Sequence, residues 1–233
     1  MGVYVLDCHH KRGDSKTDMI LILYVNDLLL LGEDLSKIED IKHQLGKLYQ
    51  MRDLGPASSY LGIHITRDRN TRAICINQQV YIENTLKRFK LLNANSTNTL
   101  LPAGIHLEKS EEPVALDTKT YYQQIIGTLI YAAIGTRPDI AFVAMILSQF
   151  NNNPTQEHIK YAKDVLQYPK GTKELKIKYN GASNARLIGY SDSDWGENRD
   201  DHHSTSGHVF LMPNGAISWA LENLTRQARN SEW

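Results

Sequence analysis

Residues 19–32 read MILILYVNDLLLLG, two apolar runs on either side of one polar pair. The runs are residues 20–25 and 28–31, and the pair is Asn26-Asp27. No polar face recurs at the helical period, so the stretch predicts a β-hairpin that is buried on both faces and has a polar tip. Asparagine tolerates the positive φ that a tight two-residue turn needs. The pair therefore indicates either turn chemistry alone or two side chains presented to a metal ion.

Two helices and two strands are predicted to follow the hairpin. Ser36-Lys-Ile-Glu39 has the spacing of a capping box, and the apolar residues after it recur at helical spacing, so a helix should cover the sheet. That apolar face consists of Ile38, Ile41, Leu45 and Leu48. Residues 60–66 and 73–77 are predicted strands, and Asn77 is expected to cap a second helix.

The second helix carries a basic face, which consists of Lys87, Arg88 and Lys90. Its opposite side is apolar and includes Ile82, Leu86 and Phe89. Three neighbouring cations are either solvated surface charge or contacts to a nucleic-acid backbone. The sequence alone leaves both interpretations open.

Residues 93–113 are rich in Asn, Thr, Ser and Pro and predict a linker. Beyond it, three apolar stripes at helical spacing predict three short amphipathic helices that pack as a bundle. The stripes are Tyr122, Ile125, Ile126, Leu129, Ile130 and Ala133; Ile140, Val143, Ala144 and Leu147; and Tyr161, Ala162, Val165 and Leu166. Thr136 and Thr155 stand where N-caps are expected. Pro169 and Gly171 are expected to end the third helix, with the proline shortening it.

From residue 175 the pattern again favours strands. The candidates are residues 175–179, 187–190, 208–212 and 216–219. Asn214-Gly215 lies between the last two and is a strong signal for a tight hairpin turn.

Several blocks of this sequence resemble the reverse transcriptases of copia-type long-terminal-repeat retrotransposons. Tyr24-Val-Asn-Asp27 is similar to the tyrosine-x-aspartate-aspartate hairpin of that family. Further blocks follow in the family's order, over roughly residues 3 to 219: Met51-Arg-Asp-Leu-Gly-Pro with Tyr60-Leu-Gly-Ile, Tyr81-Ile-Glu-Asn with Leu86-Lys-Arg-Phe, Ile126-Gly-Thr-Leu-Ile-Tyr with Thr136-Arg-Pro-Asp-Ile-Ala, and Gly189-Tyr-Ser-Asp-Ser-Asp-Trp with Ser204-Thr-Ser-Gly. Five ordered blocks are far more specific than the short hairpin motif alone.

The resemblance implies an α+β chain in three parts. Residues 1–95 correspond to the C-terminal part of a reverse-transcriptase palm, and residues 96–174 to a small helical thumb or connection bundle. Residues 175–233 correspond to a truncated ribonuclease H-like domain with a partial β-meander. Similarity fades after Trp219, which favours a truncation or a shifted reading frame.

The resemblance also implies a polymerase site that uses Mg²⁺ and an RNA or DNA template-primer. In the family, both hairpin aspartates and a third from an earlier strand hold two cations, and the hairpin tyrosine contacts nucleic acid. Here Asp27 keeps its carboxylate, Asn26 is a degenerate position, and Tyr24 is present. The chain is expected to begin too late to include the earlier strand, because neither Asp7 nor Asp18 has matching neighbours. We therefore expect no polymerase activity.

The ribonuclease H part is expected to be equally incomplete. Asp192 matches the family's first metal-binding carboxylate, whereas Asp194 in the same block is expected to order the loop. Glu232 falls near the position of the next acid, but its neighbours do not match, and we treat the spacing as coincidence.

Composition excludes several classes of protein. The 26 basic and 26 acidic residues give zero net charge, which argues mildly against a strong free-standing DNA binder. Cys8 and Cys75 cannot form a disulfide framework, and Cys8-His9-His10 lacks a partner pair at zinc spacing. We find no signal-peptide pattern and no apolar run long enough to span a bilayer, so a cytoplasmic or nuclear location is favoured over secretion.

Three hypotheses follow. The first is a partial or decayed copia-type polyprotein without catalysis of its own. The second is a domesticated or effector-like binding protein that reuses this fragment without being an enzyme. The third is a working enzyme that obtains its missing residues from another chain.

Overall fold

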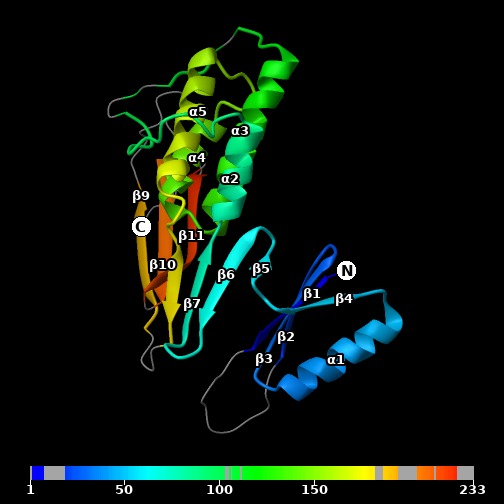
Figure 1. Cartoon of the computed structure of the whole chain (residues 1–233). Coiled ribbons are helices and arrows are strands. Elements are labelled where there is room, and N and C mark those ends of the chain that lie inside the picture. The colour runs from blue at the N-terminus through cyan, green and yellow to red at the C-terminus, as the bar shows by residue number, and fades with distance from the viewer. Residues whose placement is uncertain are drawn as a thin grey trace, which may run out of the picture. The chain divides into compact units, whose positions relative to one another are not determined.

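The protein is described here from a computed structural model. The structure describes residues 2–7, 19–102, 105, 107–110, 112–181, 186–193, 204–212 and 214–224. These residues form five α-helices and three small sheets, which confirms the predicted α+β class (Figure 1). The chain divides into two compact units, Met1–Thr66 and Arg67–Trp233, which we call the hairpin unit and the helical unit.

The hairpin unit is built on a four-stranded sheet with one helix. Its elements are β1 (Gly2–Asp7), β2 (Ile20–Tyr24), β3 (Asp27–Gly32), α1 (Leu35–Leu48) and β4 (Arg52–Pro56). The strand order is β2-β3-β1-β4. β2 is antiparallel to β3, whereas β1 is parallel to both β3 and β4. A short hairpin follows, in which β5 (Ser59–Tyr60) pairs with β6 (Ile63–Asp68).

The predicted hairpin forms, but the prediction that both of its strands are buried was wrong. In β3, Leu28, Leu29 and Leu30 are at most 6% exposed, whereas every side chain of β2 is between 43% and 58% exposed. The reason is topological, because β2 is the edge strand of the sheet. Helix α1 packs on Leu28 and Leu30 through Ile38, as the helical spacing predicted.

The N-terminus of α1 differs from the predicted capping box. The helix begins at Leu35, and its N-cap is Asp34, whose carboxylate accepts hydrogen bonds from the backbone amides of Ser36 and Lys37. The hydroxyl of Ser36 donates to the same carboxylate at 2.5 Å. An ionised acceptor at an N-cap also benefits from the helix dipole, so Asp34 takes the capping position ahead of Ser36.

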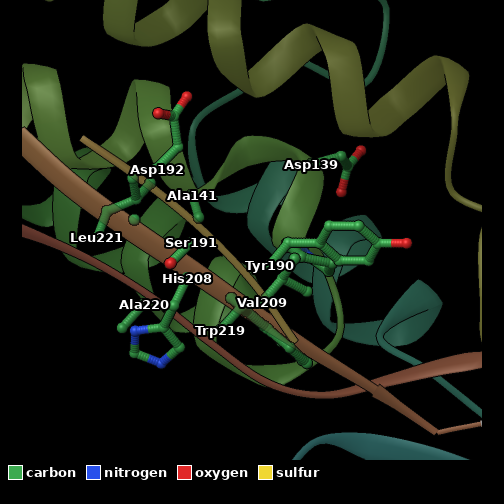
Figure 2. Close-up of a pocket in the computed structure, with 12 residues that line it drawn as sticks. Asp139, Ala141, Tyr190, Ser191, Asp192, His208, Val209, Trp219, Ala220 and Leu221 are labelled. Atoms are coloured by element: carbon green, nitrogen blue, oxygen red, sulfur yellow. The ribbon is translucent and has the colours of Figure 1, made fainter. Parts of the chain in front are cut away.

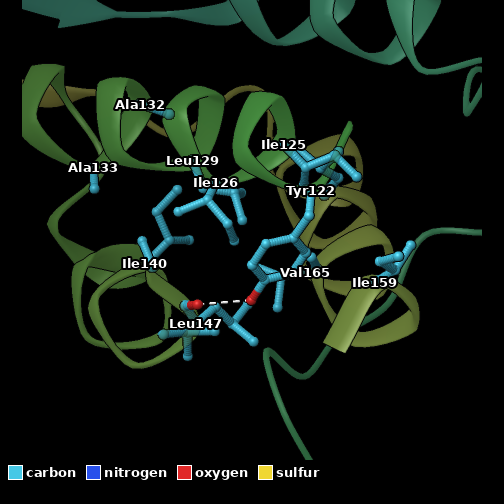
Figure 3. Packing of buried hydrophobic residues seen from close by; sticks show 14 of the residues in the cluster. Tyr122, Ile125, Ile126, Leu129, Ala132, Ala133, Ile140, Leu147, Ile159 and Val165 are labelled. Carbon is cyan, nitrogen blue, oxygen red and sulfur yellow. Dashed lines mark hydrogen bonds between the residues drawn. The ribbon is translucent and has the colours of Figure 1, made fainter. Parts of the chain in front are cut away.

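The helical unit contains the predicted three-helix bundle. Its helices are α2 (Gln79–Arg88), α3 (Leu116–Gly135), the 3-10 turn η1 (Pro138–Ile140), α4 (Ala141–Ser148) and α5 (Gln156–Gly171). The apolar stripes predicted for α3, α4 and α5 face one another and form the main core (Figure 3). Inside it, the hydroxyl of Tyr122 donates a 2.6 Å hydrogen bond to the carbonyl of Leu147, and burial raises the pKa of that phenol. The predicted linker packs on this core through Leu100, Leu101 and Leu107.

Thr136 was predicted to be an N-cap, but it is the C-cap of α3. Its hydroxyl donates to Oε1 of the buried Gln78 at 2.9 Å, and this contact ties the start of α2 to the end of α3. Gln78, rather than Asn77, is the N-cap of α2, although Asn77 accepts a hydrogen bond from the backbone of Gln79.

A buried arginine fixes the corner that follows α3. Arg137 is 1% exposed and makes two hydrogen bonds to Asp139, from Nε at 2.9 Å and from Nη2 at 2.7 Å. Nη2 also donates to the hydroxyl of Thr172 at 2.7 Å, at the end of α5, and the guanidinium lies over the ring of Tyr168. A buried charge with this many partners is satisfied and therefore specifies the geometry of the corner.

Helix α5 begins as predicted but is not shortened by its proline. Thr155 is the N-cap, and its hydroxyl accepts from the amide of His158, whose Nδ1 in turn accepts from the amide of Thr155. Pro169 lies inside the helix, which continues to Gly171. The proline has no N–H to donate to the carbonyl of Val165, so the helix loses one hydrogen bond there, and it continues for only two residues beyond the proline.

The remaining strands of the helical unit form two groups. β7 (Ala73–Asn77) pairs antiparallel with β8 (Ile177–Asn180), and both belong to the four-stranded sheet with the order β5-β6-β7-β8. β9 (Ile188–Ser193), β10 (Ser204–Met212) and β11 (Gly215–Leu224) form an antiparallel sheet in the order β11-β10-β9. Asn214, at φ 70°, lies in the predicted turn between β10 and β11.

Some predicted features lie outside the described residues. They are Cys8-His9-His10, Asp18, Asp194 and Glu232. Within the described ranges, the longest helices are too short or too polar to cross a bilayer.

Candidate functional site

The hairpin tip is a two-residue turn with backbone strain. Tyr24 pairs directly with Asp27, which leaves Val25 and Asn26 as the turn residues. Val25 has a φ of 50°, so this valine, and not the asparagine, holds the left-handed conformation expected of the turn. Positive φ at a β-branched residue costs on the order of 1–3 kcal/mol and occurs mostly where the surroundings impose it.

Asp27 stands at the start of β3, between the exposed tip and the buried leucines. It is partly buried, whereas Tyr24 and Asn26 are exposed. The Asp27 carboxylate also acts on Tyr60, because burial and then the nearby negative charge raise the pKa of that phenol. Sequence reasoning did not connect Tyr60 with the hairpin tip, although both belong to blocks that resemble the same family.

The sheet register separates Asp7 from Asp27. β1 runs parallel to β3 and places Gly2 opposite Asp27, whereas Asp7 lies opposite Gly32. At about 3.3 Å per residue, Asp7 is roughly 16 Å along the sheet from the hairpin tip. The backbone register therefore places residue 7 at the far end of β3 from the hairpin tip.

A different acid, Asp53, lies toward the same end of the sheet as Asp27. β1 pairs Val3 with Leu28 on one side and with Asp53 of β4 on the other, so Asp53 is two strands from β3, on the order of 10 Å away. Its carboxylate accepts from Nζ of Lys42 at 2.8 Å and from the amide of Gly55 at 2.9 Å. The hydrogen bond from Lys42 holds the Asp53 pKa below its usual value. Asp53 is thus already used as the partner of a lysine.

These positions give a weak donor set for a divalent cation. Magnesium prefers several anionic oxygens, and the tip offers the carboxylate of Asp27 and the neutral amide oxygen of Asn26. In the part of the chain that the structure describes, no group of three or more His, Cys, Asp or Glu side chains is arranged to hold a metal ion. The residues at the hairpin therefore do not fit the magnesium site that the resemblance implies.

The second candidate acid, Asp192, lines a cavity in the helical unit (Figure 2). The cavity has a volume of about 660 Å³ and lies between the sheet β9–β11 and the segment that joins η1 to α4. The register places Tyr190, Val209 and Trp219 in one row of its floor and Asp192, Gly207 and Leu221 two residues further along, with Ser191, His208 and Ala220 between them. Asp139 lines the cavity from the helical side.

Asp192 has no second free carboxylate beside it among the described residues. It is exposed, and its Oδ1 accepts from the amide of Ser193 at 2.9 Å. Asp139 is held by Arg137 through two hydrogen bonds. The described residues that line the cavity thus do not include the carboxylate cluster that two-metal hydrolysis needs.

The predicted basic face lies at the end of α2, with Lys87, Arg88 and Lys90 all exposed. The guanidinium of Arg88 lies 5.4 Å from the ring centre of Phe89, and this ring contacts Tyr121 edge to face. The ammonium of Lys163, on α5, lies 5.1 Å from the centre of the Tyr121 ring. Sequence reasoning missed Lys163 because the three helices that meet here are far apart in the chain.

The family model and two of the relatives point to one class of protein. The family model described as reverse transcriptase (RNA-dependent DNA polymerase) matches residues 2–103. The chain is 37% identical over 216 residues to the retrovirus-related Pol polyprotein from transposon TNT 1-94 of Nicotiana tabacum, covering 91% of this chain and 16% of the relative. It is 32% identical over 213 residues to a putative transposon Ty5-1 protein of Saccharomyces cerevisiae, covering 91% of this chain and 68% of the relative.

A third relative carries a different kind of name. The chain is 37% identical over 98 residues to the secreted RxLR effector protein 161 of Plasmopara viticola, covering 42% of this chain and 69% of the relative. No solved structure matches the chain.

Proposed function

Because this chain belongs to the copia-type family of retrotransposon Pol polyproteins, within their reverse-transcriptase region, we propose that it is a polymerase fragment without catalysis of its own. The observation that carries the proposal is Asn26, which stands beside Asp27 where the resemblance implies a second carboxylate. An amide oxygen can contact a cation but brings no negative charge. At an effective dielectric constant of about 20, one carboxylate near a divalent ion is worth several kcal/mol.

Three parts make up the proposed fragment. Residues 1–95 are the C-terminal part of the palm, residues 96–174 the thumb or connection bundle, and residues 175–233 an incomplete ribonuclease H-like domain. The hairpin β2–β3, the packed helices α3–α5 and the antiparallel sheet β9–β11 support this division.

The proposed ligand is nucleic acid, a template-primer of RNA and DNA, bound weakly. Lys87, Arg88 and Lys90 contact the phosphate backbone, and Tyr24 at the hairpin contacts the primer end. The exposure of all four side chains supports this role. Because the net charge is zero, binding should be weak. It should also fall as salt is added, because each cation that contacts a phosphate releases a counterion.

Primer extension tests the catalytic part of the proposal. With magnesium or manganese, the purified chain should extend no primer, and Asn26→Asp should not restore synthesis because Asp7 is placed away from the tip. Template-dependent synthesis by the unmodified chain would refute the proposal. Synthesis by Asn26→Asp alone would show that two carboxylates at the tip are sufficient.

Nucleic-acid binding is tested by fluorescence anisotropy with a labelled hybrid duplex at several salt concentrations. Replacing Lys87, Arg88 and Lys90 together by alanine should weaken binding at least tenfold and flatten its salt dependence. Replacing Lys37, Lys47 and Lys109 by alanine removes the same charge elsewhere in the chain and serves as the control. Equal losses in the two triple variants would mean that binding is unspecific.

A second candidate function is that of an effector-like binding protein that is not an enzyme. It is supported by the likeness to the Plasmopara viticola protein over 42% of this chain. Both candidates predict an absence of polymerisation, so nucleic-acid affinity separates them. Salt-sensitive binding that depends on the basic face favours the polymerase fragment, and its absence favours the binding protein.

A further inference from the structure

Among the residues that the structure describes, none covers the outer edge of strand β2. It is the terminal strand of its sheet among the described strands, and its pairing with β3 runs without a bulge from Ile20 to Tyr24. Natural edge strands are commonly guarded by lysine, proline or a bulge, which prevent pairing with another chain. β2 reads ILILY and has none of these features.

Its side chains are exposed on both faces of the sheet. Leu21 and Leu23 share the face that α1 covers, because they pair with Leu30 and Leu28. Ile20, Ile22 and Tyr24 project from the opposite face, and all five side chains are at least 43% exposed. A contact that covers this strand must therefore be apolar on both faces, and an added strand meets that requirement.

The backbone pattern fixes which residues can pair. In a two-residue hairpin, the residues that flank the turn form a hydrogen-bonded pair, so Tyr24, Ile22 and Ile20 direct their backbone groups toward β3. Leu21 and Leu23 therefore direct their amides and carbonyls outward. A second strand can bond to β2 through these two residues.

We propose that β2 joins two copies of this chain into a dimer, pairing antiparallel with the β2 strand of the second copy about a twofold axis at Ile22. Leu21 then lies opposite Leu23 of the second copy and exchanges backbone hydrogen bonds with it. Ile22 meets Ile22, and Ile20 meets Tyr24, so every cross-strand pair is apolar. The sequence of β2 is thus complementary to itself, which a closed twofold interface requires.

The exposed area suits such a dimer. The five residues of β2 and Val25, which is 77% exposed, form the patch. With on the order of 100 Å² accessible per side chain, at most about 600 Å² per copy can be buried, so the interface reaches at most the lower limit of about 1,200 Å² per pair for specific interfaces. The dimer should therefore dissociate on dilution.

Sedimentation velocity on the full chain, over a range of concentrations, tests the proposal. The unmodified protein should shift from monomer to dimer as its concentration rises, and Ile22→Lys should remain monomeric because two lysines would meet at the axis. Phe142→Lys, which changes an exposed apolar residue of the helical unit, should dimerise normally. Amide hydrogen exchange of β3 checks that the hairpin unit of Ile22→Lys remains folded.

Cysteine cross-linking tests the register, in a background in which Cys8 and Cys75 are serine. Ile22→Cys should form an intermolecular disulfide under mild oxidation, because a pair without mutual hydrogen bonds brings its Cα atoms to about 4.5 Å. Ile20→Cys should not, because its copies lie roughly 13 Å apart in this register. A monomer at every soluble concentration, dimerisation unchanged by Ile22→Lys, or equal cross-linking at both positions would overturn the proposal.

Discussion

Where the structure describes side chains, the two units differ in how their apolar residues are placed. The described buried residues of the helical unit form one large core cluster around α3, α4 and α5, whereas those of the hairpin unit cluster as Leu28, Leu30 and Ile38, next to the exposed strand β2. The polar groups differ in the same way. Arg137 is buried with several partners, while the tip beside Asp27 is strained and exposed. The helical unit therefore supplies its own interior, whereas the hairpin unit exposes an apolar strand that an additional element could cover.

The largest effect is expected from removing the hydrogen bonds of Arg137, which fix the corner after α3 in the helical unit. Arg137→Ala leaves Asp139 and Thr172 without their buried partner and should lower the free energy of unfolding by about 3–5 kcal/mol. Tryptophan fluorescence during urea denaturation measures this, because all three tryptophans belong to the helical unit. A loss below about 1 kcal/mol would mean that the corner is held mainly by apolar contacts.

Matched leucine truncations compare the two cores directly. Leu147→Ala should lower the free energy of unfolding by about 3–5 kcal/mol, because the surrounding helices cannot collapse into the space that the leucine side chain leaves. Leu30→Ala should cost about 2–3 kcal/mol, since the neighbouring edge strand is exposed and can adjust. Fluorescence follows the first variant and hydrogen exchange of β3 the second. Equal costs would contradict the contrast between the units, because both leucines are fully buried.

Relieving the strain at the turn should have a smaller, stabilising effect. Val25→Gly removes the side chain that opposes a φ of 50°. After the entropic cost of glycine, it should raise the free energy of opening of the hairpin by up to about 1 kcal/mol and so slow hydrogen exchange there. Val25→Ala keeps a side chain at the same φ and should gain less. Faster exchange in the glycine variant would show that Val25 stabilises the tip by packing.

The smallest effect is expected on the stability of the hairpin unit at acidic pH. The folded-state pKa of Asp53 is lowered, chiefly by the hydrogen bond from Lys42. The pair therefore contributes its stability above the unfolded-state pKa of about 3.9 and loses it as the pH falls through the folded-state value. Asp53→Asn should reduce the acid sensitivity of the hairpin unit, but only slightly because the side chain is half exposed. Hydrogen exchange between pH 5 and pH 3 measures the free energy of opening of the hairpin unit. If the pair contributes nothing, this free energy will change with pH equally in the unmodified protein and in Asp53→Asn.

Much of the fold followed from local patterns. The apolar period located α1 and the three bundle helices, and Asn214-Gly215 located the β10–β11 turn, because these signals lie within a few residues. The burial of β2 was mispredicted, since strand order depends on which distant strand pairs with β3.

The candidate site was predictable only in part. The charge lost at Asn26 is visible in the sequence, but the place of Asp7 depends on the parallel register of β1, and the partner of Asp53 lies on α1. The link from Arg88 through Phe89 and Tyr121 to Lys163 needs three helices to meet. Such tertiary contacts leave no periodic signal in the chain.

A calorimetric titration of the purified chain with magnesium, in parallel with Asn26→Asp and Asp27→Asn, measures whether the hairpin tip still binds the ion. We expect no tight, saturable uptake by the unmodified chain and no change on Asp27→Asn, because one carboxylate and one amide hold the ion poorly. Asn26→Asp should bind magnesium more tightly than the unmodified chain. Tight uptake by the unmodified chain that Asp27→Asn abolishes would contradict the account.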